Sequence, residues 1–139
     1  MKTLFTKSRA LVLLIAGALL VLVAVAILVS PGEFYAANNI QPGSNTSLLN
    51  ELKAPAGFLL VAGLFMMAAI FVAGLTDAAL ALAAMIYLSY AGSRFASMLL
   101  DGAPAEGLVQ AAVLEAVVGL ACLAMVALRR PKIARMAWC

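Results

Sequence analysis

Histidine is absent from this sequence, and cysteine occurs only twice, as Cys122 and Cys139. Without imidazole, the chain has no histidine ligand for haem or zinc. The two cysteines, one inside an apolar run and one at the last position, form neither a disulfide framework nor a CxxC pair. We therefore predict no metal site and no cofactor.

Motifs of catalysis are missing as well. A Ser-His-Asp arrangement requires the absent histidine. No glycine-rich phosphate loop and no EF-hand loop occurs in the sequence. We predict no catalytic residues, and that the protein is not an enzyme.

Charge is scarce, and its distribution is uneven. Charged residues make up 11% of the 139 residues, whereas soluble domains average about 25%. A chain of this length is expected to form one domain. Most basic residues lie near the two ends of the sequence: Lys2, Lys7, Arg9, Arg129, Arg130, Lys132 and Arg135. This pattern is typical of membrane topology rather than of nucleic-acid binding, so we predict no nucleic-acid partner.

Four apolar runs are long enough to cross a bilayer core, which takes about 20 residues. We predict spans at about residues 10–29, 56–75, 78–99 and 107–128. Pro31 and Gly32 stop the first helix, and the polar residues that follow predict an outer loop over 31–55. The first run resembles a signal peptide, but a signal core has only ~7–15 residues. We therefore predict a retained first span.

The predicted fold is all-α, a four-helix transmembrane bundle that forms a single domain over 1–139. The short polar break at Thr76 and Asp77 makes the second and third spans antiparallel neighbours. Lysine and arginine residues that flank spans stay on the cytoplasmic side of the membrane. We therefore predict a protein of the bacterial inner membrane with both termini in the cytoplasm. Ala10, Gly17 and Ala24 form a small-residue stripe along which another helix could approach closely.

Two residues of opposite charge lie inside the predicted spans, Arg94 in the third and Glu115 in the fourth. A single charge at the bilayer centre costs about 2.5–3.5 kcal/mol on insertion scales. With a rise of ~1.5 Å per residue, the depths of the two residues below the outer ends differ by only ~5 Å. We therefore predict that Arg94 and Glu115 can pair in the outer half of the membrane.

Further polar residues extend this candidate site. Tyr87 and Tyr90 share a helical face with Arg94, and Glu51 lies at the outer entrance of the second span. Two interpretations remain open. In one, Arg94 and Glu115 are a structural ion pair that holds the third and fourth spans in register. In the other, these five residues bind a ligand, with Arg94 holding an anionic group or Glu115 taking up a proton.

Three short segments carry a resemblance. They are Asn50 to Gly57, Arg94 with the turn Leu100 to Pro104, and Glu115 with Val118 to Leu120. They resemble the acidic-Leu-basic-x-x-x-Gly entry, the span-three arginine with its outer turn, and the span-four glutamate of the DUF4345 family. The resemblance covers most of the chain and implies a small bacterial membrane protein with four spans and an uncharacterised function. Lys53 stands where arginine is expected, which argues against a bidentate anion clamp there.

Two functions are compatible with the sequence. The first is a scaffold or accessory subunit that packs against a larger membrane complex or against itself, as the small-residue stripe and short loops favour. The second is binding or transport of a small amphiphile, a lipid or a quinone, in an outward-facing cavity lined by Arg94, Glu115 and Tyr90. Membrane lipids are expected partners in both cases.

Overall fold

The computed structural model describes residues 2–128, with side chains from Thr6 onward, and this part of the chain contains helices and turns only. Its long helices are α1 (Lys2–Val29), α3 (Thr46–Ala68), α4 (Thr76–Asp101) and α5 (Glu106–Ala127). All four are long and apolar enough to cross a membrane. The predicted all-α fold with four spans is confirmed, while the predicted basic tail after Leu128 lies outside the described residues.

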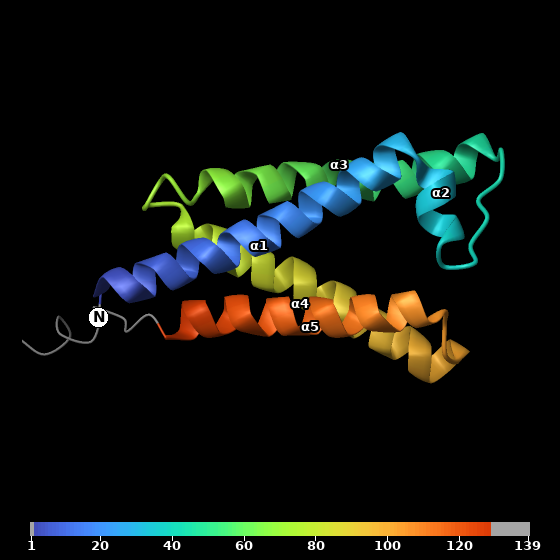
Figure 1. Cartoon of the computed structure of the whole chain (residues 1–139). Helices are drawn as coiled ribbons and strands as arrows, with labels where there is room; N and C mark the ends of the chain where they lie inside the picture. The colour runs from blue at the N-terminus through green and yellow to red at the C-terminus, as the bar shows by residue number, and fades with distance from the viewer. Residues whose placement is uncertain (1, 129–139) are drawn as a thin grey trace, which may run out of the picture.

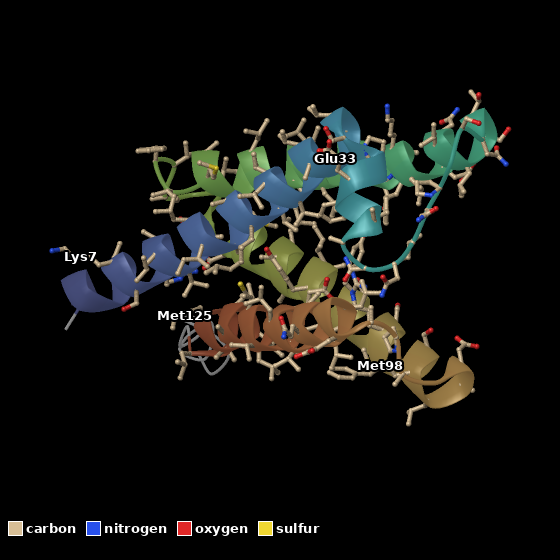
Figure 2. The ribbon with its side chains drawn as sticks, turned by 45° about the vertical axis from the view of Figure 1, so that its right-hand side comes forward. Lys7, Glu33, Met98 and Met125 are labelled. Carbon is tan, nitrogen blue, oxygen red and sulfur yellow. The ribbon has the colours of Figure 1, made fainter. Side chains whose placement is uncertain are left out.

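The four long helices form two antiparallel hairpins, α1 with α3 and α4 with α5, within which the packing is most extensive. The start of α1 and the end of α5 lie at one end of the bundle (Figure 1). The hairpins are close together at that end, near Lys7 and Met125, and diverge toward Glu33 and Met98 (Figure 2). We call these the narrow end and the wide end.

Apolar residues at helical spacing form the core between the hairpins. The fully or almost fully buried members include Leu13, Ala16, Leu20 and Ala24 on α1, Leu59, Ala62 and Met66 on α3, Leu80, Ala83 and Ala84 on α4, and Val118 and Cys122 on α5. Many of these side chains are small. The helices therefore approach closely, as is usual where lipid removes the hydrophobic drive for association.

Gly17 and Gly63 form the contact point of α1 and α3. A Cβ atom at Gly63 would lie 2.8 Å from the carbonyl oxygen of Gly17, and a Cβ atom at Gly17 would lie 2.8 Å from that of Gly63. The two backbones therefore touch. The small-residue stripe of the first span meets α3 at this point, and Ala24 on the same stripe is completely buried.

The second span differs from its predicted range of 56–75. Helix α3 begins at Thr46, where the side chain of Asn45 accepts a hydrogen bond of 3.1 Å from the backbone N–H of Leu48 and caps the helix. The helix then continues through Pro55. Its 23 residues reach about 34 Å at ~1.5 Å per residue, enough to cross the ~30 Å core before the chain turns after Ala68.

The predicted outer loop over 31–55 is also wrong in part, because it contains the short helix α2 (Pro31–Ala36) and the first turns of α3. Proline is favoured in the first turn of a helix, where its missing N–H is not needed. Pro31 accordingly starts α2 directly after α1 ends. The polar connection between α2 and α3 covers only the residues from Ala37 to Asn45.

Candidate ligand-binding cavity

A cavity of about 390 Å³ lies between the two hairpins toward the wide end. Ligand pockets in proteins typically measure about 300–1,000 Å³. All five helices contribute to its wall, which is mainly apolar: Leu19, Leu20, Val23, Ile27, Leu52, Leu59, Ile86, Leu108 and Leu114. Such a wall suits a hydrocarbon body.

Arg94 and Glu115 meet at one side of this cavity. The Nε atom of Arg94 lies 3.0 Å from Oε2 of Glu115 and 3.2 Å from Oε1, so one N–H is shared by both carboxylate oxygens. The side chain of Arg94 is 31% exposed and that of Glu115 is 16% exposed. Because both charges are largely removed from water, each is stabilised by the other. The structure therefore brings together the two charges of the third and fourth spans, on α4 and α5.

The terminal nitrogens of Arg94 take no part in this pairing. Its hydrogen bonds within the described residues all use Nε, which leaves Nη1 and Nη2 without a protein acceptor there. A guanidinium group has five N–H donors in a planar fork. Four of them remain available to a molecule in the cavity.

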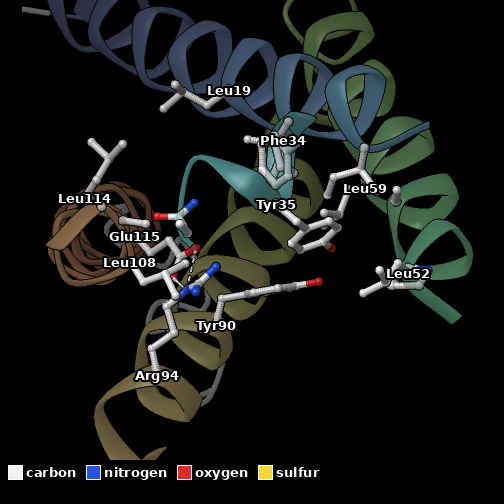
Figure 3. Close-up of a pocket in the computed structure, with 18 of the residues that line it drawn as sticks. Leu19, Phe34, Tyr35, Leu52, Leu59, Tyr90, Arg94, Leu108, Leu114 and Glu115 are labelled. Atoms are coloured by element: carbon white, nitrogen blue, oxygen red, sulfur yellow. Dashed lines mark hydrogen bonds and ion pairs between the residues drawn. The ribbon is translucent and has the colours of Figure 1, made fainter. Parts of the chain in front are cut away.

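Tyr35 and Tyr90 extend into the same space from α2 and α4 (Figure 3). Neither hydroxyl has a hydrogen bond to another described residue. Burial raises the pKa of the Tyr35 hydroxyl and the nearby Tyr90 raises it further, while the Arg94 guanidinium lowers it. The hydroxyl of Tyr35 is therefore protonated at neutral pH and can donate a hydrogen bond.

Tyr87 lines the cavity, but its polar atom is already bonded. The hydroxyl donates a 2.7 Å hydrogen bond to the carbonyl oxygen of Ala16 on α1, and the residue is only 4% exposed. Tyr87 thus offers an aromatic wall to a ligand. Its hydroxyl joins α4 to the other hairpin.

Removal of this hydroxyl is expected to weaken the bundle modestly. The Tyr87→Phe variant should lose about 0.6 kcal/mol of unfolding free energy, with a maximum near 1.7, as interhelical hydrogen bonds in membrane proteins do. The measurement is unfolding in mixed micelles with increasing SDS, followed by helical circular dichroism. An unchanged midpoint would show that the Tyr87–Ala16 bond contributes nothing.

Asn38 and Gly107 join the wide end of the two hairpins. A Cβ atom at Gly107 would come within 2.5 Å of Oδ1 of Asn38, so the amide group of Asn38 packs directly on the backbone of α5. Both residues line the cavity. Glycine at position 107 lets the connection after α2 close over the cavity.

Glu51 is placed differently from the other predicted site residues. It is exposed on α3 and is not among the residues that line the cavity, whereas its neighbour Leu52 is. Successive residues on a helix point in different directions, which explains the difference. Within the described residues, no three acidic or cysteine side chains come together as metal ligands.

A second ion pair lies at the narrow end, where Arg9 of α1 contacts Asp77 in the first turn of α4. Arg9 was predicted from the sequence as part of a cytoplasmic basic flank, and its pairing with Asp77 was not predicted. The signal was present, since Asp77 is the acidic residue between the second and third spans. It becomes informative only when α1 and α4 are known to be neighbours.

A comparison of the sequence with models of protein families shows to which family the chain belongs. The family described as "Domain of unknown function (DUF4345)" matches residues 9–126. The chain belongs to the DUF4345 family. The matched segment of this DUF4345 protein contains the whole cavity wall and both ion pairs. Searches of curated proteins and of solved structures found no match.

Most residues that line the cavity of this DUF4345 protein were not predicted as part of the site, and four of them come from α2 and the residues just after it: Phe34, Tyr35, Asn38 and Ile40. The two aromatic residues lie edge to face, with ring centroids 5.3 Å apart. All four lie within the stretch that was interpreted as an outer loop. The sequence signal was Pro31, which can start a helix as well as end one.

Proposed function

We propose that this DUF4345 protein binds a small amphiphile in the cavity between its hairpins. One observation carries the proposal: on a mainly apolar wall, the terminal nitrogens of Arg94 and the hydroxyls of Tyr35 and Tyr90 have no protein acceptor among the described residues. Among the described residues these atoms are not buried, so a molecule that enters the cavity can accept hydrogen bonds from them. A molecule with a polar head and an apolar body supplies both kinds of contact.

The shape of the cavity matches this division. Arg94 and Glu115 lie together on one side, the hydroxyls of Tyr35 and Tyr90 are directed away from Arg94 (Figure 3), and leucine and isoleucine side chains of α1, α3 and α4 form much of the remaining wall. Phe34 and Tyr35 of α2 complete the wall at the wide end (Figure 3). In this arrangement, the amphiphile places its head against α4 and α5 and its tail against α1 and α3.

The proposed location is the inner membrane of a bacterium. Most lysine and arginine residues lie near the two ends of the sequence, and such residues stay in the cytoplasm. The narrow end then faces the cytoplasm and the wide end, with the cavity, faces outward. In this orientation, an amphiphile enters from the outer leaflet or from the outer surface.

The predicted role as a scaffold or accessory subunit stays a prediction, because no single face of the bundle stands out as a contact surface for a partner. Exposed apolar side chains occur on all four long helices, for example Leu22, Val61, Met85 and Val117. Lipid tails require such a surface around the whole bundle. It therefore does not single out one face for a partner protein or for a second copy.

The proposal is tested by filling the cavity. Ala111 lines it on α5, on the same face as Glu115. Native mass spectrometry of the purified full chain, released from detergent, is expected to show wild-type protein with a retained amphiphile. The Ala111→Phe variant should retain less than about a tenth as much, a loss of more than ~1.4 kcal/mol in binding.

Ala124→Phe is the matched control for this experiment. Ala124 lies on the same helix, is exposed and does not line the cavity, so this variant should retain the amphiphile like the wild type. If all three proteins retained the same amount, the bound molecules would be lipids on the outside of the helix bundle, and the proposal would be contradicted. Complete absence of a bound molecule from the wild type would also contradict the proposal.

A further inference from the structure

The cavity has a balanced charge. Among the residues that line it, Arg94 and Glu115 are the charged ones, and they are paired with each other. The positive charge of the guanidinium group is therefore already compensated before a ligand enters. A second charge brought into this space would lack a counterion.

The hydrogen-bonding groups of the cavity are not balanced in the same way. Both carboxylate oxygens of Glu115 accept from Nε of Arg94. The groups left over are the terminal N–H donors of Arg94, the hydroxyls of Tyr35 and Tyr90, and the amide group of Asn38. The N–H groups of Arg94 can only donate, whereas the hydroxyl and amide groups can donate or accept, so a ligand head that satisfies Arg94 brings acceptor oxygens.

Charge and hydrogen bonding together restrict the ligand. An anionic head would leave one uncompensated negative charge close to the Glu115 carboxylate, in a space of low dielectric constant. A cationic head would face Arg94 and a set of donors. A neutral head with oxygen acceptors meets neither difficulty.

We propose that the amphiphile has an uncharged head with carbonyl-type acceptor oxygens, as in an ester, a ketone or a quinone. This inference rests on the proposed function and specifies its ligand. The terminal N–H groups of Arg94 and the hydroxyls of Tyr35 and Tyr90 donate to different acceptor oxygens of the head. Glu115 keeps the guanidinium fork aimed into the cavity and receives no proton from the ligand.

Three probes of equal chain length test the proposal: methyl dodecanoate, dodecanoate and dodecylammonium. Each is titrated at neutral pH into the full chain in lipid nanodiscs, and binding is measured by native mass spectrometry. We expect the ester to bind at least about tenfold more tightly than either ion. Tyr90→Phe should weaken the ester about fivefold, the typical effect of one hydrogen bond, and leave the two ions unchanged.

The outcomes separate the inference from the function on which it rests. The proposal of a neutral head would be wrong if dodecanoate bound more tightly than the ester. It would also be wrong if all three probes bound equally to wild type and none bound to Ala111→Phe. In both cases the cavity would still be a binding site for an amphiphile. Failure of every probe to bind wild type above Ala111→Phe would overturn the proposed function itself. Comparison of methyl dodecanoate with a decyl-substituted benzoquinone then identifies whether the carbonyl belongs to an acyl ester or to a ring.

Discussion

Replacing Glu115 by leucine is expected to destabilise the bundle by about 3 kcal/mol, because the charge of Arg94 then stays in the protein interior without a counterion. The carboxylate is 16% exposed and holds the Nε atom of Arg94 through both oxygens. Unfolding in SDS-containing mixed micelles, followed by helical circular dichroism, measures the loss.

Three further variants separate charge from packing in this prediction. Arg94→Leu combined with Glu115→Leu removes both charges and should recover most of the loss, since a buried pair is often replaceable by apolar residues. The exchange of the two residues, Arg94→Glu with Glu115→Arg, should also recover stability. Glu51→Gln, which changes an exposed carboxylate outside the cavity, should stay near wild type. If Glu115→Leu alone unfolds like wild type, the pair does not hold α4 to α5.

The second large effect is expected at the crossing of α1 and α3. In Gly63→Leu, the new Cβ would lie 2.8 Å from the carbonyl oxygen of Gly17 and 2.9 Å from a methyl group of Val21. Backbone atoms cannot move aside as a flexible side chain can, so the hairpin must separate. Overpacking of a tight core costs about 1–3 kcal/mol for added methylenes. Leucine should exceed that range and abolish the peak of folded protein in gel filtration.

Gly57→Leu provides the matched control on the same helix. No atom lies within 4 Å of a Cβ placed at Gly57, and leucine has a higher helix propensity than glycine by roughly 0.8–1.0 kcal/mol. This variant should fold normally. Similar behaviour of Gly57→Leu and Gly63→Leu would show that the defect comes from hydrophobicity, and that the α1–α3 contact is not the cause.

The four long apolar helices were predictable because each depends on a local property. A run of about 20 apolar residues favours a span wherever it occurs, and the third and fourth spans were predicted to within a few residues of α4 and α5. The pairing of Arg94 with Glu115 was accessible for a similar reason. A short turn makes the two helices neighbours, and depth follows from residue counts.

Other features depend on relations that the sequence does not express locally. The start of α3 at Thr46 requires Asn45 to cap a helix that then passes through Pro55, a combination that reads locally as a loop. The cavity depends on the angle between the hairpins, and hence on contacts between residues far apart in the sequence, such as Tyr87 with Ala16. Glu51 was predicted from its position near the span entrance, whereas its direction on α3 excludes it from the cavity wall.

The polar contacts between the hairpins are unevenly spaced, and this spacing determines how the hairpins can move relative to each other. Arg9–Asp77 at the narrow end and Tyr87–Ala16 near the middle bind α4 to α1, while the wide end is joined across by the packing of Asn38 on Gly107. The first two contacts act as a fulcrum, and the halves of the helices beyond Tyr87 act as lever arms. We expect a larger occupant to turn the hairpins about this fulcrum, so that the size of the ligand becomes a difference in tilt at the outer face of the membrane.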